Sequence, residues 1–410
     1  MDTVVIGAGW AGLGVSYELA QRGIRHTVFE RARIGETWRT QRWDTFRLNT
    51  TTADTLMPGE NYDGPDPDGA LTCIEFITLL EDYAHRHGLP VEEGRAVTAL
   101  STGDDGGFIV EVAGAAVRAS NVVIATGSLN RPLPRPAWAA PLLLPQIDGC
   151  DYRSADSLPA GPVLVVGSGQ SGGQIAHDLV GAGRTVYLST GRVGRLIRRY
   201  RGKDTLRWLD DSGFMDVSRA ELIAAAPDGR LPARGVIGAT RTLSLQFLSS
   251  EGVMLTGRLT GLFNDGRLTF RDDVVANILL GDEASARVKN WIDAYINRSG
   301  IDAPPAEEDP AETVAPRLPD PPILELDVSN LGCIIWCTGF RGDYSYIGVA
   351  GALDEQGQPI HVGGVGTVPG MFFAGLDFGT KRKSGTIRAV GEESALFTAL
   401  IAERLAAGRS

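Results

Sequence analysis

The sequence predicts an α/β protein built from two Rossmann-like dinucleotide-binding domains, the second inserted into the first. Near the N-terminus, a short apolar run is followed by the glycine-rich turn GAGWAG from Gly7 and then by a helical pattern. The same unit returns 160 residues later, with the turn GSGQSG from Gly167. A strand, a tight glycine turn and a helix in this order open a βαβ unit that binds a dinucleotide. Two such units predict two nucleotide sites.

The first half of the chain alternates between strand and helix patterns. Apolar runs predict strands at 3–6, 26–29, 108–112 and 116–125, and apolar residues at helical spacing predict helices at 10–22 and 74–85. Residues 31–52 and 61–70 lack a clean periodicity, and we expect loops there, the first of them facing a cofactor. The prolines at 131–136 predict an extended connection out of the first domain.

The second half begins with the repeated unit and ends with a return to the first domain. It predicts strands at 163–166, 185–189, 333–336 and 371–374, and helices at 170–182, 282–297 and 386–406. The acidic, proline-rich stretch 303–322 is interpreted as a solvated linker, with a plain surface loop as the alternative. We expect residues 1–150 and 310–410 to form one domain and residues 151–309 the other.

Composition and charge exclude several classes of binding partner. The net charge of −11 and the pI near 5.1 argue against nucleic acid and anionic membranes. The first 24 residues lack the basic segment of a signal peptide, and no apolar run is long enough for a transmembrane helix. Four scattered cysteines give neither a disulfide framework nor a metal site. We therefore expect a cytoplasmic, metal-free protein with small-molecule partners, and the sequence leaves a homodimer open.

Three glycines, an acid and a threonine carry the first site, which we assign to FAD. Gly7, Gly9 and Gly12 let the backbone and the helix N-terminus reach a pyrophosphate. Glu30 lies 23 residues after Gly7, at the end of the next strand, where its carboxylate can bind both hydroxyls of a ribose. Thr126 closes a later strand within VVIATG. The alternative is an ordinary βα turn without a ligand.

The second site repeats the glycines without the acid. Gly167, Gly169 and Gly172 match the first motif, and Ser189 stands 22 residues after Gly167. A carboxylate there would repel a 2′-phosphate, so we predict NADPH rather than NADH. Arg192, with Ser189 or Thr190 beside it, is our candidate for binding that phosphate. We expect a solvated basic face for most of the other basic residues that follow, which are Arg195, Arg198, Arg199, Arg201 and Lys203.

A nicotinamide donor beside a flavin is the arrangement that hydride transfer needs. A disulfide reductase would also need a redox cysteine pair soon after the first unit, and residues 35–52 contain no cysteine. Cys333 and Cys337 lie four apart in a predicted strand, on one face, and we interpret them as core thiols.

Several motifs extend beyond generic nucleotide binding. The segments GAGWAG, ERARIGETWRTQRWDTFRLNT, YDGPDPDG, VVIATG, DYR, VLVVGSGQSGGQIA, GRVGRLIRRYRGKD and IIWCTGF occur in this order. Together they resemble the class B flavoprotein monooxygenases, a group that includes flavin-containing monooxygenases and Baeyer–Villiger enzymes. The resemblance runs from Val4 to about Glu393.

The resemblance implies a reaction and the residues that serve it. In that family NADPH reduces FAD, dioxygen adds to form a C4a-(hydro)peroxyflavin, and a small organic substrate is oxygenated at N, S or C. Trp38 and Arg39 are then expected to border FAD, and Gln170 and Ser171 to contact NADPH. Asn49 in RLNT resembles the family's active-site asparagine. The alternative for Asn49 is a turn-forming side chain.

One departure from the family keeps other functions open. Where relatives carry FxGxxxHxxx(Y/W), this chain reads LLLPQIDGCDY, so that Tyr152 matches and Asp148 replaces the histidine. The alternative enzyme is an NADPH oxidase or flavin reductase that releases peroxide. The alternative outside enzymes is a flavin-binding partner or sensor protein, which the two intact glycine motifs disfavour.

The C-terminal helix and the residues before it complete the predicted site. We expect the helix N-terminus, near Ser384, to point at the flavin pyrimidine, where its dipole would stabilise reduced flavin. Lys381 and Lys383 are two of only four lysines in the chain, and such a cluster predicts an anionic substrate. The alternatives are a solvated loop tip and a second contact to the NADPH phosphates.

Overall fold

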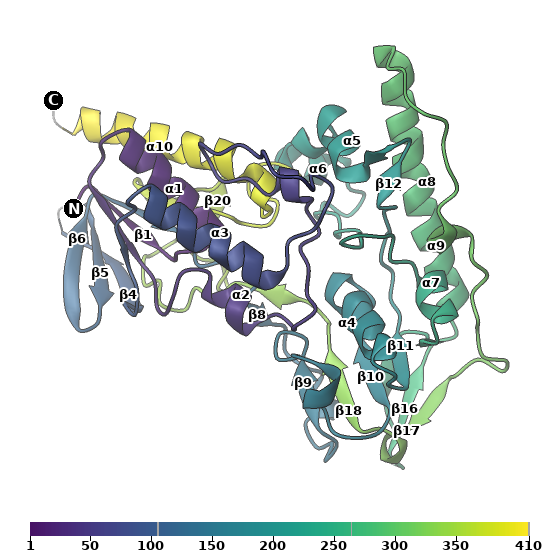
Figure 1. The fold of residues 1–410 in the computed structure, drawn as a ribbon. Helices are drawn as coiled ribbons and strands as arrows, with labels where there is room; N and C mark the ends of the chain where they lie inside the picture. The colour runs from purple at the N-terminus through teal and green to yellow at the C-terminus, as the bar shows by residue number, and fades with distance from the viewer. Residues whose placement is uncertain (105, 264, 409–410) are drawn as a thin grey trace.

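Two sheets of mainly parallel strands form the centre of the protein, in a computed structural model that describes residues 1–104, 106–263 and 265–408 (Figure 1). In the first sheet, β1 pairs in parallel with β2 on one side and with β7 on the other. Its strands in spatial order are β20 (His361–Val362), β21 (Val365–Gly366), β22 (Met371–Phe373), β7 (Asn121–Ile124), β1 (Thr3–Ile6), β2 (His26–Phe29) and β3 (Val91–Glu92). This sheet also has an antiparallel edge, formed by β20 and β21.

The second sheet repeats this plan around the second glycine motif. β10 pairs in parallel with β11 and with β18. The strands in spatial order are β14 (Met254–Thr256), β11 (Val186–Ser189), β10 (Val163–Val166), β18 (Cys333–Trp336) and β9 (Gln146–Asp148). Because parallel strands are covered on both faces, their sequences are continuous apolar runs, which is why they could be predicted.

Each parallel sheet has helices on one face and a small antiparallel sheet on the other. On β1, Val5 packs into the core that reaches the helices, while Val4 and Ile6 pack toward the antiparallel sheet. That sheet contains β4 (Val97–Thr102), β5 (Phe108–Val112) and β6 (Ala115–Ala119). Its counterpart on the second parallel sheet contains β15 (Leu259–Leu262), β16 (Arg267–Phe270) and β17 (Glu325–Asp327).

The helices gather in two groups, and both chain ends lie in the half that holds the first sheet (Figure 1). The first half contains α1 (Trp10–Gln21), α2 (Glu36–Thr40), α3 (Cys73–Arg86) and α10 (Val390–Ala407), with α1 packed on α10. The second half contains α4 (Gln170–Gly181), α5 (Thr205–Asp211), α6 (Arg219–Ala225), α7 (Leu245–Ser250), α8 (Val274–Ser299) and α9 (Pro310–Thr313).

The two crossings between the halves run side by side. β8 (Arg131–Pro132) pairs antiparallel with β19 (Phe340–Arg341). β9 and β18 therefore lie beyond the crossings, in the second sheet, although we placed residues 146–148 and 333–336 in the first domain. We propose the domain limits at this pair of strands, near 132 and 340.

The alternation of strands and helices is confirmed, although the bounds of several elements differ; α8, for example, begins at Val274 rather than at residue 282. The strand expected at 116–125 is split at Ser120, because β6 belongs to the antiparallel sheet and β7 to the parallel one. The loop at 31–52 contains α2. The solvated linker at 303–322 is wrong in its central part: Asp309 accepts a hydrogen bond from Thr242, and Glu312 forms ion pairs with Arg195 and Lys289.

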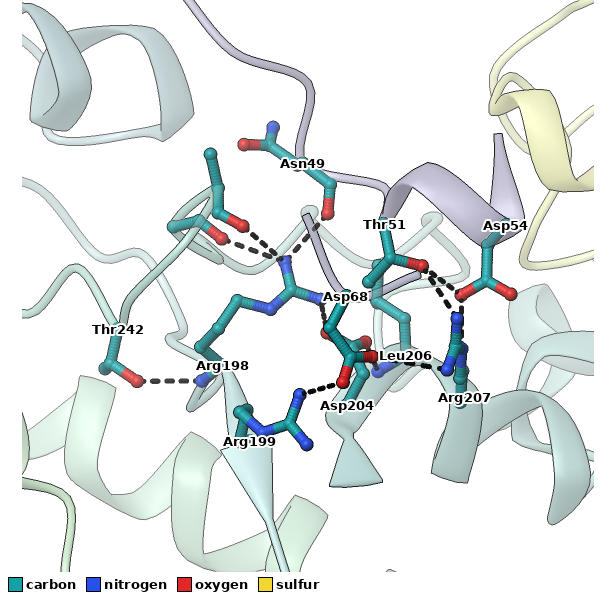
Figure 2. A network of polar contacts seen from close by, with 12 residues as sticks. Asn49, Thr51, Asp54, Asp68, Arg198, Arg199, Asp204, Leu206, Arg207 and Thr242 are labelled. Atoms are coloured by element: carbon teal, nitrogen blue, oxygen red, sulfur yellow. Dashed lines mark hydrogen bonds and ion pairs between the residues drawn. The ribbon is translucent and has the colours of Figure 1, made fainter. Parts of the chain in front are cut away.

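A cluster of charges joins the two halves (Figure 2). Asp54, at the end of the 3-10 turn η1 (Thr52–Asp54), pairs with Arg207 of α5 and with Arg388 of η6 (Ile387–Ala389), each at 2.9 Å. Burial alone would raise the pKa of Asp54, but Arg388, Thr51 and Arg207 hold this pKa below its ordinary value. Asp54 is therefore a carboxylate that one inserted-domain arginine and one C-terminal arginine share.

Replacing Asp54 with Asn should lower the free energy of unfolding by roughly 1–3 kcal/mol at pH 7, because Arg207 and Arg388 lose a charged acceptor. The folded pKa is below the unfolded value of about 3.9. The carboxylate therefore stabilises the fold above that pH, and its contribution is lost as pH falls through the folded pKa. The difference in Tm between wild type and Asp54→Asn should shrink as the pH is lowered from 7 to about 3.5.

Asp68→Asn is the matched control, because Asp68 also pairs with Arg207 but its side chain is 41% exposed. Exposed pairs contribute little, so this change should cost less than about 1 kcal/mol. Equal losses for the two variants would show that Asp54 is not the central charge of the cluster.

Candidate functional site

The first glycine motif opens onto a cavity of about 450 Å³ at the carboxyl ends of β1, β2 and β7. This is the edge of a parallel sheet at which ligands bind. Five of the predicted FAD residues line the cavity: Gly7, Gly9, Glu30, Trp38 and Thr126. Arg39 lies elsewhere, because its guanidinium pairs with Glu81 of α3.

The three glycines of this motif have different roles. A side chain at Gly7 would place its Cβ 2.6 Å from the carbonyl oxygen of Ala125, and Gly7 has φ +103°. A Cβ at Gly12 would lie 1.9 Å from the carbonyl oxygen of Gly7. A Cβ at Gly9 would meet no described atom within 4 Å. Gly7 and Gly12 therefore permit close packing, and Gly9 leaves open space before α1, where a pyrophosphate fits.

Glu30 is fixed at the end of β2 by backbone groups. Ala8 N donates to one carboxylate oxygen at 2.8 Å, and Ala32 N donates to the other at 3.0 Å. The side chain is buried and lines the cavity. A carboxylate held in this way can accept further hydrogen bonds, since each oxygen has two lone pairs. Its place suits the ribose of a dinucleotide.

The second motif repeats the close approaches of the first. A Cβ at Gly167, whose φ is +105°, would lie 2.5 Å from the carbonyl oxygen of Cys337, and a Cβ at Gly172 would lie 1.8 Å from that of Gly167. A Cβ at Gly169 would again meet no described atom within 4 Å. Cys337 thus packs under this turn as Ala125 packs under the first. The open backbone lies at the N-terminus of α4, where Gln170 and Ser171 form the first turn.

The basic run after β11 divides into one free arginine and five paired residues. Arg195 pairs with Asp282 and Glu312, and Arg198 pairs with Asp204, so the expected solvated face is wrong for these two buried arginines. The others pair with carboxylates at exposed or half-buried positions, namely Arg199 with Asp68, Arg201 with Asp293 and Lys203 with Asp211. Within the described part of the chain, no hydrogen bond or ion pair involves the side chain of the exposed Arg192.

The hydroxyls beside Arg192 are already used. Ser189 is buried; its Oγ donates to Gly257 O at 3.1 Å and accepts from Leu259 N at 3.0 Å. Thr190 Oγ1 donates to Thr256 O at 2.8 Å. Arg192 is therefore the residue of this group whose side chain remains available for a phosphate.

Asn49 lies between the two halves and is not among the residues that line the cavity. Its Oδ1 accepts hydrogen bonds from Gln170 Nε2 at 3.2 Å and from Gln174 Nε2 at 3.0 Å. The structure thus brings together two predicted residues, Asn49 and Gln170, from different domains. The side-chain oxygen is used by glutamines of α4, so it does not form a local turn.

The residues before the last helix are held by the protein itself. The ammonium groups of Lys381 and Lys383 both contact Asp216 and Glu392, and neither residue is among those lining the cavity. This geometry gives no support to an anionic-substrate site. Ser384 is buried, and its Oγ accepts from Thr380 N and Lys381 N, while its neighbour Gly385 lines the cavity.

Several cavity residues could not be found by motif. Arg42 stacks on Trp38, with its guanidinium carbon 4.7 Å from the ring centroid, and burial lowers its pKa. Tyr346 reaches the cavity from far along the sequence, and its hydroxyl lies 3.4 Å from Thr126 Oγ1. RTQRW gave a weak signal for Arg42, whereas nothing in the sequence relates Tyr346 to the first motif.

The cysteines are thiols in apolar surroundings. All four are free, and burial raises the pKa to about 12 for Cys337 and to about 11 for Cys333 and Cys150. Thiols with such pKa values are poor nucleophiles at neutral pH. Cys73 Sγ donates to Trp38 O.

The described residues offer neither a metal site nor a membrane-spanning helix. Within 1–104, 106–263 and 265–408, no three His, Cys, Asp or Glu side chains are placed to hold a metal ion. Over the same residues, no helix combines the length and apolar character needed to span a membrane.

Comparisons with known proteins agree with this geometry. A family model described as pyridine nucleotide-disulphide oxidoreductase matches residues 4–219. An uncharacterized CzcO-like oxidoreductase of Geobacillus kaustophilus is 30% identical over 398 residues, which cover 96% of each protein. A flavin-containing monooxygenase from Stenotrophomonas maltophilia shares the fold with TM-score 0.65 and 18% identity, over 98% of each chain. The protein OTEMO, solved with FAD and NADP, gives TM-score 0.57 and 16% identity, over 100% of this chain and 86% of its own.

Gly9→Val should yield a folded protein that retains no FAD, because the new side chain has room in the protein and occupies the place of the pyrophosphate. Gly169→Val is the matched variant and should stay yellow while losing NADPH binding. Flavin absorbance of the purified proteins and an NADP⁺ titration measure these effects. A yellow, FAD-replete Gly9→Val protein would contradict the assignment of the first site.

Arg192→Ala should raise the KM for NADPH and leave the KM for NADH nearly unchanged, because only NADPH carries the 2′-phosphate. One lost charge-assisted hydrogen bond corresponds to roughly 1.5–3 kcal/mol. Arg199→Ala, in which an exposed arginine that pairs with Asp68 is removed, should change neither KM. Equal weakening of both cofactors in Arg192→Ala would remove this residue from the phosphate site.

Proposed function

The chain belongs to the pyridine nucleotide-disulphide oxidoreductase family, and from this premise we propose that it is an FAD- and NADPH-dependent monooxygenase that oxygenates a small organic substrate. Its fold is that of class B flavoprotein monooxygenases, as the sequence motifs indicated. One observation carries the proposal. The glycine turns from Gly7 and from Gly167 have the same close backbone approaches, and each leaves open space before a helix N-terminus.

The residues present fit both cofactors. Glu30, Gly9 and the N-terminus of α1 would hold the ribose and pyrophosphate of FAD, and Trp38 and Thr126 border the rest of the cavity. Gly169, the N-terminus of α4 and Arg192 would hold NADPH. When bound, FAD would accept hydride from NADPH and activate dioxygen. The protein binds the two cofactors, orients them and keeps water from the reacting atoms.

The family name raises the question of a disulfide-reducing activity, which the thiols do not support. Such an enzyme needs a redox cysteine pair at the flavin, and residues 35–52 contain no cysteine. Cys73 forms a hydrogen bond with Trp38 O, and burial raises its pKa. Among the described residues, no cysteine is part of a disulfide.

An NADPH oxidase is the second candidate, and one observation favours it. Asp148 stands where relatives carry a histidine, and its carboxylate pairs with Arg135 at 2.9 Å. The ion pair fixes this position at the end of β9, and a carboxylate cannot replace the histidine that, by the resemblance, helps the two domains to move and the cofactor to rotate. Loss of this cofactor movement would favour release of peroxide over oxygen transfer.

Measuring NADPH consumption, oxygenated product and hydrogen peroxide in the same reaction separates the two candidates. Amines, sulfides and ketones are tested in turn with dioxygen and NADPH. For a true substrate, the product should approach the NADPH consumed, and peroxide should be minor. If peroxide accounts for all the NADPH with every substrate class, the protein is an NADPH oxidase and the proposal is wrong.

Asn49→Ala should reduce its flavin at near the wild-type rate and give about tenfold less product per NADPH, because we place the Asn49 amide at the oxygen-transfer step. Tenfold is the size of one lost hydrogen bond of about 1.4 kcal/mol. Stopped-flow reduction and the product-to-peroxide ratio measure the two steps. Asn61→Ala, at an exposed loop position, is the control and should behave as wild type. Slowed reduction with unchanged coupling would place Asn49 at the hydride-transfer step instead.

A further inference from the structure

The inserted domain holds Asn49 at both its side chain and its backbone. Gln170 and Gln174 lie four residues apart on one face of α4, and both donate to Asn49 Oδ1. From below, Arg198 Nη1 donates to the backbone carbonyl of Asn49 at 2.8 Å (Figure 2). Asn49 itself belongs to the segment that follows the first βαβ unit. One domain thus fixes a side chain of the other.

A chain of hydrogen bonds determines which way the Asn49 amide faces. The backbone N–H of Ile237 can only donate, and it donates to Gln170 Oε1 at 3.0 Å. Gln170 is therefore left with its NH2 group toward Asn49, which must present its oxygen. Gln174 supplies a second donor to the same oxygen. The NH2 group of Asn49 is consequently directed away from α4.

Arg198 fixes the backbone to which this amide is attached. The residue is buried, and its guanidinium also donates to Gly238 O at 2.9 Å and pairs with the buried Asp204. Its backbone N–H donates to Thr242 Oγ1 at 2.7 Å. A buried guanidinium with a carboxylate partner and several carbonyl partners has little freedom to move. Figure 2 shows the Asn49 side chain pointing away from Arg198 and its carbonyl oxygen pointing toward it.

We propose that Gln174, together with Gln170 and Arg198, is a positioning residue that presents the Asn49 NH2 group as a hydrogen-bond donor to an acceptor oxygen at the oxygen-transfer step. This inference rests on the proposed monooxygenase function and assigns a role to Gln174, which lies within the segment VLVVGSGQSGGQIA but to which the motif gave no role. The N-terminus of α4 also belongs to the second glycine motif. The same helix would therefore bind the nicotinamide cofactor and position the Asn49 amide.

Two substitutions at Gln174 distinguish orientation from packing. Gln174→Leu removes one of two donors, so Gln170 still holds the Asn49 oxygen. Gln174→Glu places an acceptor there, which favours rotation of the Asn49 amide until its NH2 group faces the new carboxylate. A role in packing alone predicts that the two variants lose similar activity or that the leucine is worse, because glutamate keeps the shape of glutamine and leucine does not. A role in orientation predicts the reverse order.

The test measures the product-to-peroxide ratio and the anaerobic rate of flavin reduction for these variants of the holoenzyme. Gln174→Glu should lower the ratio about tenfold, as Asn49→Ala does, and Gln174→Leu should lower it by less. Flavin reduction should stay within about twofold of wild type in both. Thr45→Val is the matched control, because Thr45 donates to Asp178 one turn further along the same face of α4. It should leave the ratio unchanged.

Two activity results would overturn the inference. The first is wild-type coupling in Gln174→Glu, and the second is equal uncoupling in all three variants, Thr45→Val included, which would indicate a general effect of the interface.

A thermal measurement keeps the inference testable if the proposed function fails. If wild-type protein yields only peroxide, the monooxygenase proposal is wrong, while the hydrogen-bond geometry is still tested by Tm. The losses of Tm in Asn49→Ala and Gln174→Leu should then be non-additive, because both remove the same hydrogen bond. Additive losses in the double variant would show that the two side chains do not interact and would overturn the assignment.

Discussion

The close approach of backbone to backbone at Gly7 and Gly12, repeated at Gly167 and Gly172, is the constraint on which the rest of the structure depends. In each turn, one glycine packs on the carbonyl of the neighbouring strand and another packs on the first glycine. Any side chain there would push the helix away from the sheet. With the helix held close, its N-terminal N–H groups face open space, which is the condition for binding a pyrophosphate.

The two halves must also face each other in a fixed way, because a hydride donor and its acceptor react only in contact. The interface achieves this with charges of opposite sign. Asp54 and Asp68 of the first half meet Arg207 and Arg199 of the second (Figure 2). Arg388 also pairs with Asp54 and completes the cluster. The same interface holds the Asn49 segment against α4. Within the arginine-rich run after β11, Arg198 and Arg199 contact the first half. The side chains of Arg195, Arg201 and Lys203 pair within the second half, and Arg192 alone of this run is left free of partners among the described residues.

The sequence predicts features whose signal lies in neighbouring residues. It does not predict ion pairs whose partners lie far along the chain. The signals for buried parallel strands and for the glycine turns come from consecutive residues. β1, β10 and both glycine turns could therefore be predicted. The break at Ser120 between β6 and β7 was missed, because the sequence of residues 116–125 does not show that its two parts belong to different sheets. Arg195 looked solvated because its partners, Asp282 and Glu312, lie about a hundred residues away. Lys381 looked free for the same reason, since Asp216 neutralises it across the interface.

The central claim is that one chain holds a flavin and NADPH in productive contact. An anaerobic titration of the purified yellow protein tests it most directly, with the flavin absorbance followed as NADPH or NADH is added. We expect about one equivalent of NADPH to bleach the flavin and NADH to do so only at much higher concentration. A protein that takes up no FAD, or whose bound flavin is not bleached by NADPH, would contradict it.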